Sequence, residues 1–296
     1  METRVFKTKE LAEKLLAGVK REAETFLANN ARKPTLAVVL VGTDPASQIY
    51  VGKKAETCKA HGLNALDFKM AAEEGFARLT QLVQELNARA DVDGILVQSP
   101  LPKGWDEEKI QAMIAPEKDV DGFHPQNVGA LSLHAKKILE SGLPSCTPAG
   151  VMEILKEANI SLAGKHAVVI GRSNIVGKPM AQMLLSGDAT VTICHSKTPD
   201  LKETCRRADV LVAAIGKARF VTKEFVKPGA ALIDVGINRE MVDGKAKVVG
   251  DVNSESVTGV AGFLTPVPNG VGPMTIAILI RNTVRAAQNR TQTNSR

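Results

Sequence analysis

VVIGRSNIVGKPM, residues 168–180, is the stretch that most strongly indicates the fold. A run of β-branched residues leads to Gly171, and a helix is expected to begin at about Pro179. A Rossmann fold holds the pyrophosphate of a dinucleotide on such a strand, turn and helix, against N–H groups at the start of the helix. The G-x-G-x-x-G fingerprint is incomplete, because Ser173 takes the second glycine position and Gly177 comes one residue late. Taken alone, the stretch also suits an ordinary glycine-rich turn.

The strand expected next, TVTICHS (190–196), indicates which dinucleotide is bound. Folds that bind NAD usually end this strand with an acidic residue, which accepts a hydrogen bond from the ribose 2′-hydroxyl. Here Lys197 and Thr198 follow, without an acid, and Arg172 stands in the preceding turn. Because Arg can meet a 2′-phosphate through two N–H donors, we favour NADP over NAD, with Arg172 and Ser196 at the phosphate. A solvated strand end is the simpler alternative.

Strand-like and helix-like stretches alternate along the rest of the chain. Strands are expected at 34–42, 63–70, 92–100, 165–171, 190–196, 209–216, 230–237 and 247–252. Helices are expected at 11–29, 46–62, 76–89, 107–116, 151–160, 179–187, 200–208 and 272–288, with a frayed polar tail at 289–296. This alternation predicts βαβ units and largely parallel sheets, and the pattern starts again at about residue 141.

The composition limits the kinds of partner. The 296 residues carry a net charge of +6, but Lys and Arg are spread along the chain and only 3% of residues are aromatic. With little to stack on bases, nucleic-acid binding is less favoured than an enzyme whose substrate and cofactor are anions. A basic, non-enzymatic binding module is the alternative. We expect no membrane segment, because no apolar run approaches the roughly 18 residues of a span.

The cysteines and histidines bear on compartment and metal binding. Cys58, Cys146, Cys194 and Cys205 are scattered without a C-x-x-C pair, which favours free thiols in a reducing cytosol. The five histidines form no H-x-x-x-H pair, so we expect no metal site. The N-terminal stretch does not read as a signal or transit peptide. We therefore expect a cytoplasmic protein.

Tyr50 and Lys54, in SQIYVGKK (47–54), are four residues apart in an expected helix and so share one face. Such a pair is most often part of an ordinary amphipathic surface. A Tyr-x-x-x-Lys pair also supplies the acid of short-chain dehydrogenases, but there it follows the nucleotide-binding glycines, whereas here it precedes Gly171. An oxidoreductase of that type, acting on another small substrate, is the alternative enzyme.

Five long stretches together resemble one known family. They are VGTDPASQIYVGKKAETCKAHG (41–62), DGILVQSPLPKG (93–104), PEKDVDGFHPQNVG (116–129), GRSNIVGKPM (171–180) and TPVPNGVGPMT (265–275). In this order the chain resembles the bifunctional methylenetetrahydrofolate dehydrogenase/methenyltetrahydrofolate cyclohydrolase family over about residues 34–285.

The resemblance implies a two-domain α/β fold with the active-site cleft between the domains. A folate-binding catalytic domain would comprise residues 1–140, completed by the C-terminal helix at 272–296. A Rossmann-type NADP-binding domain would comprise residues 141–271. A homodimer is also implied.

The resemblance further implies roles for single residues. Lys54 would handle protons, held in place by Gln98. Tyr50 would pack against the folate, and Asp121 would bind N–H donors of the pterin. Cofactor-contacting positions correspond to Gly171, Arg172, Ser173, Ser196 and Ile237, and the loop beside folate and nicotinamide contains Pro268, Gly270 and Gly272.

The implied reaction belongs to one-carbon metabolism. It transfers hydride from 5,10-methylenetetrahydrofolate to NADP⁺ and then hydrolyses the methenyl product to 10-formyltetrahydrofolate. An adjacent nitrogen lone pair stabilises the cation that hydride loss creates, so the first step needs positioning more than an acid. The second step moves protons to and from a tetrahedral intermediate, which a lysine can do.

Several features depart from the family pattern, among them a start without the usual Asp-Gly. Asn269 stands where glycine is usual, and because Asn tolerates positive φ better than other non-glycine residues, we expect little effect. Ser99 stands where a bulkier apolar residue is common. SCTP (145–148) carries an extra polar residue before Cys146. These changes concern substrate affinity more than the type of reaction.

Overall fold

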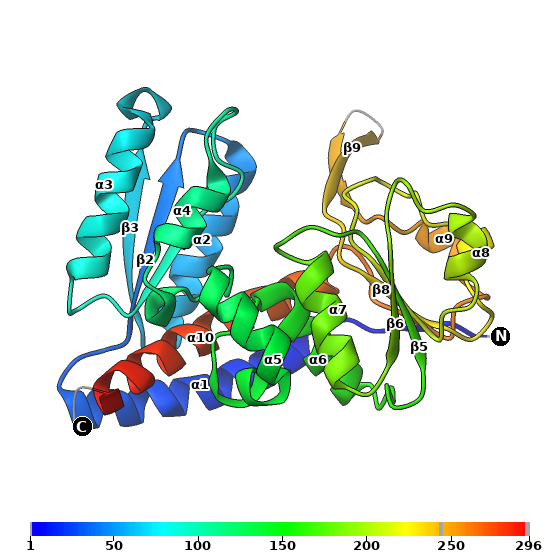
Figure 1. Ribbon diagram of the computed structural model, residues 1–296, viewed down its shortest axis with the longest axis horizontal. Helices are drawn as coiled ribbons and strands as arrows, with labels where there is room; N and C mark the ends of the chain where they lie inside the picture. The colour runs from blue at the N-terminus through cyan, green and yellow to red at the C-terminus, as the bar shows by residue number, and fades with distance from the viewer. Residues whose placement is uncertain (1, 243–244, 294–296) are drawn as a thin grey trace. The chain divides into compact units, whose positions relative to one another are not determined.

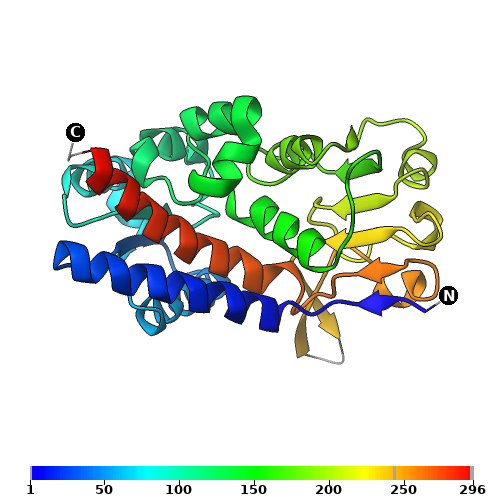
Figure 2. The same ribbon diagram turned by 90° about the horizontal axis from the view of Figure 1, so that it is seen from below.

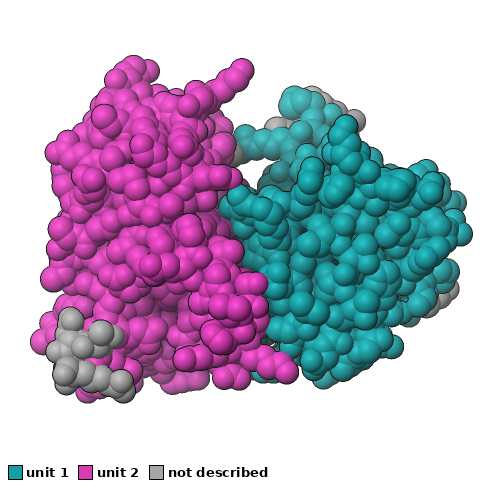
Figure 3. Space-filling model, viewed as in Figure 1, with its two compact units in different colours: residues 1–13, 147–275 teal, residues 14–146, 276–296 magenta. Residues whose placement is uncertain are grey.

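The structure, a computed structural model, describes residues 2–242 and 245–293. The chain forms two compact units, which Figure 3 shows in different colours: unit 1 comprises residues 1–13 and 147–275, and unit 2 comprises residues 14–146 and 276–296. Each unit contains a parallel sheet with helices packed against it, which confirms the predicted α/β class.

Unit 2 is built on a sheet of three parallel strands in the order β3-β2-β4 (Figure 1). The strands are β2 (Thr35–Val41), β3 (Asn64–Met70) and β4 (Gly94–Val97). Every residue of the central strand β2 is buried, as its β-branched, apolar sequence predicts. Because the strands are parallel, the loops that follow them start from one edge of the sheet, where ligands usually bind in this architecture.

Helices complete the core of unit 2. Leucines of α3 (Gly75–Ala88) and Ile110 of α4 (Glu107–Met113) form one apolar cluster with β2. α2 (Pro45–Ala60) follows β2 directly and packs against β2 and β3. Unit 2 also contains α5 (Pro125–Ser141) and the C-terminal part of α10 (Val271–Thr293). The C-terminal ends of α1 (Lys9–Asn30) and α10 lie side by side in Figures 1 and 2 and line one pocket.

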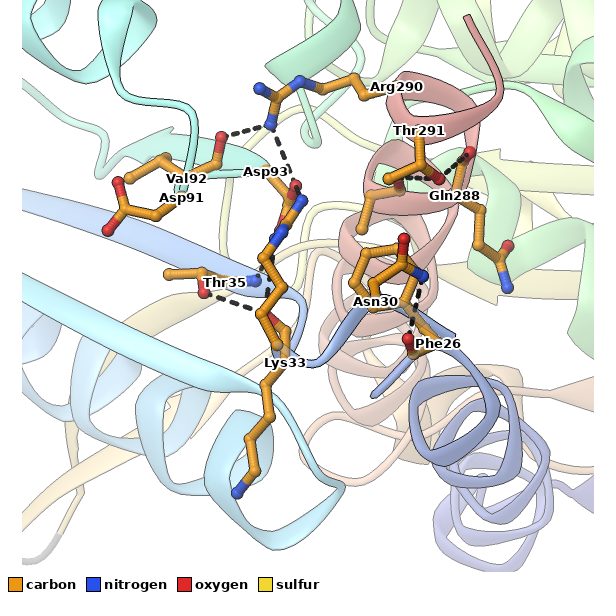
Figure 4. Close-up of polar contacts among 12 residues, drawn as sticks. Phe26, Asn30, Lys33, Thr35, Asp91, Val92, Asp93, Gln288, Arg290 and Thr291 are labelled. Atoms are coloured by element: carbon orange, nitrogen blue, oxygen red, sulfur yellow. Dashed lines mark hydrogen bonds and ion pairs between the residues drawn. The ribbon is translucent and has the colours of Figure 1, made fainter. Parts of the chain in front are cut away.

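A buried carboxylate ties distant parts of unit 2 together (Figure 4). Asp93 accepts two hydrogen bonds from the guanidinium of Arg32, at 2.7 and 2.8 Å, and a third from Arg290 at 3.0 Å. It also accepts one from the backbone N–H of Thr35 at 2.9 Å. Asp93 therefore fixes the starts of β2 and β4 to the C-terminal helix.

Unit 1 contains a six-stranded parallel sheet in the order β1-β11-β8-β7-β5-β6. Its strands are β1 (Arg4–Val5), β5 (His166–Ile170), β6 (Thr190–Cys194), β7 (Val210–Ala213), β8 (Ala231–Asp234) and β11 (Phe263–Leu264). From β5 the chain goes to β6 on one side and then to β7 on the other, so the strand order reverses between β5 and β7. That reversal is where a Rossmann fold binds a dinucleotide, at the carboxyl ends of the strands.

The remaining elements of unit 1 surround this sheet. Its helices are α6 (Cys146–Glu157), α7 (Gly177–Ser186), α8 (Leu201–Cys205) and α9 (Ser254–Val257). β9 (Asn238–Val242) and β10 (Lys245–Val249) form a separate antiparallel hairpin. Residues 1–13 lie in unit 1, since β1 pairs with β11, whereas the expected boundary kept them with residues 14–140.

The strands and helices expected from periodicity are present, with shifted ends, but some elements were missed. α5 was not predicted; it contains Gly129 and a non-helical backbone at His134, which interrupt its period. The two-residue strands β1 and β11, the strand β9 and the short α9 were missed as well. The expected fraying was wrong for 289–293, which continue α10, and residues 294–296 lie outside the described part of the chain. Among the described residues, none of the helices has the length and apolar character needed to cross a membrane.

Candidate active site

The first group of predicted site residues lies in unit 2, beginning on α2. Asp44 caps this helix, because its carboxylate accepts a hydrogen bond from the Ser47 N–H at 2.8 Å and Pro45 occupies the first turn. One face of α2 is buried, and Tyr50 and Lys54 are half-buried beside that face. The four-residue spacing thus places both side chains on the same side of the helix.

Lys54 contacts a residue that follows β4. Its Nζ donates a hydrogen bond to Oε1 of Gln98 at 2.9 Å. The Gln98 amide is fixed on its other side, because Nε2 donates to the Ser99 carbonyl at 2.6 Å and the backbone N–H donates to Val39 at 2.9 Å. A lysine ammonium only donates, so the orientation of the amide, with its oxygen toward Lys54, matches both partners.

Ser99, one of the departures from the family pattern, has a defined role in this loop. Its hydroxyl donates to Oε1 of Glu107, the first residue of α4. The other oxygen of Glu107 accepts a hydrogen bond from the Leu101 N–H at 3.4 Å. The polar side chain at position 99 therefore anchors the segment that carries Gln98 to the start of α4.

A second loop of unit 2 brings Asp121 into place. The buried Asp119 accepts hydrogen bonds from the N–H groups of Gly122 at 3.1 Å and His124 at 2.7 Å, and from Asn127 Nδ2 at 2.8 Å. Gly122 has φ +74°, and a Cβ there would lie 2.5 Å from the backbone nitrogen of Ser145. Only glycine fits this turn. Asp121 therefore lies in a short segment whose two ends, Asp119 and Gly122, are fixed.

The surroundings of Asp121 place its ionisation near neutrality. Burial raises the pKa of Asp121 to about 6, and the charge of Asp119 adds to this increase. Lys54 and the neighbouring Cys146 thiol, which also donates to the Val120 carbonyl at 3.2 Å, act in the opposite direction. Burial, together with Asp121, raises the pKa of Cys146 well above its usual value, so this thiol stays protonated and remains a donor. The charge of Lys54 therefore acts on Asp121, and Lys54 is itself hydrogen-bonded to Gln98.

The second group of predicted residues lies at the carboxyl edge of the sheet in unit 1. Gly171 ends β5 with φ +124°, and a Cβ there would lie 2.1 Å from the Ala214 carbonyl oxygen. A Cβ at Gly177 would lie 2.3 Å from the carbonyl oxygen of Gly171. The turn between β5 and α7 is therefore as tight as the pyrophosphate turn of a Rossmann fold requires, so the backbone fits a dinucleotide.

Ser173 has a different local role from the one expected. Its Oγ accepts hydrogen bonds from the N–H groups of Val176 at 3.2 Å and Gly177 at 3.3 Å, at the start of α7. Of the N–H groups at the helix start, against which a Rossmann fold holds the pyrophosphate, these two are therefore capped by Ser173. A contact between Ser173 and a cofactor stays a prediction.

The segment after β6 forms a compact turn without a carboxylate. The His195 N–H donates to Thr198 Oγ1 at 2.9 Å, and the Thr198 N–H donates to the His195 carbonyl at 2.9 Å. This turn leaves Ser196 and Lys197 exposed to solvent. Since β5 and β6 are paired neighbours, the exposed Arg172 follows the adjacent strand end. Hydroxyl, ammonium and guanidinium groups at one sheet edge suit a 2′-phosphate.

The glycine- and proline-containing loop before α10 is held by the N-terminal segment of unit 1. The Thr8 N–H donates to the Asn269 carbonyl at 3.0 Å, and the Thr8 hydroxyl donates to the Gly270 carbonyl. Asn269 has φ +75°, which confirms that it occupies the conformation in which Asn replaces glycine most easily. Pro268 is exposed, and Gly272 lies at the start of α10.

Sequence reasoning missed several residues that hold these groups in place. Asp119, Cys146 and Thr8 support Asp121 and the loop at 266–270. Asn282 of α10 donates to the carbonyls of Val120 and Pro144, both at 2.9 Å. The partners of Thr8, Cys146 and Asn282 are distant in the chain, so no local pattern identifies these three residues. The one sequence pattern that could have drawn attention to Asp119 is DVDG (119–122), in which two acidic residues flank a buried valine.

These features define the class of protein: an α/β enzyme with a Rossmann-type NAD(P)-binding unit and a second unit that carries a coupled lysine, glutamine and aspartate. Residues 6–121 match the model of the tetrahydrofolate dehydrogenase/cyclohydrolase catalytic domain, and residues 145–291 match that of the NAD(P)-binding domain. The chain belongs to the tetrahydrofolate dehydrogenase/cyclohydrolase family, as the sequence resemblance implied.

Individual relatives span nearly the whole chain. The bifunctional protein FolD of Caldicellulosiruptor saccharolyticus is 51% identical over 276 residues, which cover 93% of this chain and 97% of the relative. The crystal structure of FolD, a methylenetetrahydrofolate dehydrogenase/cyclohydrolase from Campylobacter jejuni, is 44% identical, covers 97% and 99% of the two chains and has a TM-score of 0.90. The Trypanosoma brucei dehydrogenase–cyclohydrolase, complexed with NADP and an inhibitor, is 33% identical, covers 99% of both chains and has a TM-score of 0.92.

Proposed function

We propose that the protein oxidises 5,10-methylenetetrahydrofolate with NADP⁺ and hydrolyses the methenyl product to 10-formyltetrahydrofolate. The observation that carries this proposal is the hydrogen bond between Lys54 Nζ and Gln98 Oε1, in electrostatic contact with Asp121. Relatives that cover nearly all of the chain are described as bifunctional enzymes of this kind, which supports both activities.

In the dehydrogenase step the residues of the chain mainly bind and orient. NADP⁺, when bound, supplies the hydride acceptor. Arg172 and Ser196 hold the 2′-phosphate, and the turn from Gly171 to Ser173 holds the pyrophosphate. Ile237 and the loop containing Pro268, Gly270 and Gly272 lie against the nicotinamide and the folate.

The folate is placed by two residues of unit 2. Tyr50 packs its ring against the flat substrate, and Asp121 accepts hydrogen bonds from N–H donors of the pterin. An ionised carboxylate is the stronger acceptor, and with a pKa of about 6 Asp121 is mostly ionised at pH 7. Hydride transfer itself requires no proton, so alignment is the main contribution of the protein to this step.

In the cyclohydrolase step Lys54 transfers protons. Water adds to the methenyl carbon and releases one proton to solvent, which gives a neutral tetrahedral intermediate. The Lys54 ammonium then donates a proton to N5 as the bond from this carbon to N5 breaks, and Nζ takes up the hydroxyl proton as the formyl group forms, so the ammonium is restored. One proton is released overall, so charge balances. Gln98 keeps Nζ in a fixed direction through the 2.9 Å hydrogen bond, which is the positioning that general acid–base catalysis needs.

The experiment that tests this function is a spectrophotometric assay of the purified protein with methylenetetrahydrofolate and either NADP⁺ or NAD⁺. We expect reduced nicotinamide to appear with NADP⁺, with 10-formyltetrahydrofolate as the product and little build-up of methenyl. Accumulation of methenyl would contradict the role of the Lys54 group. Absence of turnover with both cofactors would contradict the function as a whole.

We also infer that two copies assemble into a homodimer, in the cytoplasm. The hairpin of β9 and β10 supports this inference, because Met241 is 71% exposed and Val248 40% exposed. Val248 pairs with Arg239, two residues from Met241, so the two apolar side chains lie on one face of the hairpin. A second copy would cover them. Light scattering of Met241→Glu should show monomers where the wild type shows dimers; dimers in both would refute this interface.

A further inference from the structure

Two buried aspartates in unit 1 hold loops at the carboxyl edge of its sheet. Asp251 has an exposed fraction of 0%, and its carboxylate accepts four hydrogen bonds. Oδ2 accepts from the N–H groups of Ile215 at 2.7 Å and Gly216 at 3.0 Å. Oδ1 accepts from the Lys217 N–H at 2.8 Å and from Asn238 Nδ2 at 2.9 Å. One side chain thus fixes the loop after β7 and the segment after β8.

Asp234, the last residue of β8, holds Asp251 in turn. Its Oδ1 accepts hydrogen bonds from the N–H groups of Gly236 at 3.0 Å and Asp251 at 2.9 Å. Its Oδ2 accepts from the Val252 N–H at 3.0 Å. The Asp234 N–H donates to Thr265 Oγ1 at 2.8 Å. The two carboxylates therefore form a continuous connection from β8 to the loop at 215–217.

The backbone around these carboxylates leaves no room for other side chains. A Cβ at Gly236 would lie 2.3 Å from Cγ of Asp251. A Cβ at Gly250 would lie 1.7 Å from Oδ2 of Asp234. Backbone packs directly on both carboxylates, so each loop has one conformation that satisfies the hydrogen bonds.

The position of these loops indicates what they serve. The strand order reverses between β5 and β7, and a dinucleotide lies across that reversal. The turns after β5 and β6 contain Arg172 and Ser196, which suit the 2′-phosphate of the adenosine half. The loops after β7 and β8 lie on the other side of the reversal, where the nicotinamide half extends. Ile237 stands between Gly236 and Asn238, which are hydrogen-bonded to Asp234 and Asp251.

We propose that Asp251 is a positioning residue of the cofactor site: its carboxylate holds the loop at 215–217 and, through Asn238, the segment containing Ile237 in the conformation that receives the nicotinamide half of NADP. This inference rests on the proposed function. Asp251 touches neither cofactor nor substrate and acts only through the backbone that it holds.

Asp251→Asn tests the inference with little change in shape. Whichever oxygen becomes an amide nitrogen faces two N–H donors, so two of the four hydrogen bonds are lost. We expect the KM for NADP⁺ to rise about tenfold or more, as for a loss of at least 1.4 kcal/mol. Hydrolysis of methenyltetrahydrofolate without cofactor, which depends on Lys54 in unit 2, should change less than about twofold.

A double variant and a matched control separate positioning from general stability. Combining Asp251→Asn with Asn238→Asp keeps the net charge and places an acceptor opposite the new amide, so part of the lost NADP⁺ affinity should return. Asp209→Asn is the control, because Asp209 also accepts from a backbone N–H and a side chain, His166 N–H and Lys227, but precedes β7 at the opposite edge of the sheet. It should leave the KM for NADP⁺ unchanged.

The outcomes are distinguishable. An unchanged KM for NADP⁺ in folded Asp251→Asn overturns the inference, and so does an equal loss of both activities without recovery in the double variant. If Asp251→Asn does not fold, Asn238→Ala is used instead, because it removes only the hydrogen bond from Asn238 to Asp251. The KM of this variant for NADP⁺ is then compared with that of the wild type, and an unchanged value overturns the inference. NADPH titration of the wild type is made first: absence of binding there refutes the proposed function and the inference with it, whereas wild-type binding and an unaffected variant refute the inference alone.

Discussion

Replacing Lys54 by Met should separate the two activities of the protein. Met keeps most of the length of the side chain but removes Nζ, and with it the 2.9 Å hydrogen bond to Gln98 Oε1. Loss of a positioned proton-transfer group typically lowers a rate by about 10² to 10⁴, which corresponds to about 3 to 5 kcal/mol of barrier. We therefore expect methenyl hydrolysis to fall by that factor. Hydride transfer needs no proton from Lys54 and should retain activity within about tenfold.

The same substitution also affects substrate binding, because Lys54 lowers the pKa of Asp121. Without this positive charge the pKa of Asp121 rises from about 6, and at pH 7 more of the carboxyl is protonated and less able to accept a hydrogen bond from a pterin N–H. The KM for folate should therefore increase at pH 7 and recover partly at pH 8, where the carboxylate re-forms. Measuring both activities at the two pH values separates the loss of proton transfer, which persists, from the binding effect.

Lys53→Met is the matched control for this experiment. Lys53 is the exposed neighbour on α2 and has no hydrogen bond to Gln98, so its replacement should leave both activities within about twofold. The assay follows methenyl absorbance in the absence of cofactor and NADPH formation in its presence. Undiminished hydrolysis in Lys54→Met, or an equal loss of both activities in protein that still binds folate, would refute the role assigned to this lysine.

Three further predictions concern the cofactor, the pterin acid and the stability of unit 2. Arg172→Ala should raise the KM for NADP⁺ by about 10- to 100-fold, because the charged hydrogen bond between Arg172 and the 2′-phosphate is lost. NAD⁺ has no 2′-phosphate, so its KM should stay nearly unchanged. An unaltered preference for NADP⁺ over NAD⁺ would show that Arg172 does not bind the phosphate. Asp121→Asn should abolish the acidic limb near pH 6 in the pH profile of folate binding. Because the folded protein raises this pKa from about 3.8 to about 6, the contribution of Asp121 to stability is full below pH 4 and is lost as pH rises through 6. Asn at position 121 stays neutral at every pH, so the variant keeps this contribution to stability. Chemical denaturation at pH 8 should therefore find Asp121→Asn more stable than the wild type by about 1 to 2 kcal/mol. A less stable variant would contradict the raised pKa of Asp121. Asp93→Asn leaves Arg32 and Arg290 without their carboxylate and should lower the free energy of unfolding by about 3 to 5 kcal/mol, measured by urea denaturation; a loss below about 1 kcal/mol would show that the cluster is not a main tie of unit 2.

The sequence by itself determined the local elements. The buried run at 35–41 and the turn at Gly171 indicate a strand and a pyrophosphate turn, because side-chain pattern and glycine content act over a few residues. The four-residue spacing of Tyr50 and Lys54 determined that they share a helix face. Asn269 also followed from a single-residue preference, since Asn tolerates positive φ. The family motifs supplied the assignment of these positions to a reaction.

Only the tertiary structure brings the partners of these residues together. Lys54 and Gln98 meet because β2 and β4 pair in parallel and end at the same edge of the sheet. Asp251 reaches the loop at 215–217 because its N–H is held by Asp234 at the end of β8 and because Val252 forms a parallel bridge with Val221, although the residues lie far apart in the chain. β1 and β11 have two residues each, too few to show a period, and they become strands only through their pairing. Periodicity records which face of an element is buried, whereas the contacts that orient a catalytic group depend on which elements become neighbours, and that is decided by the packing of the whole unit.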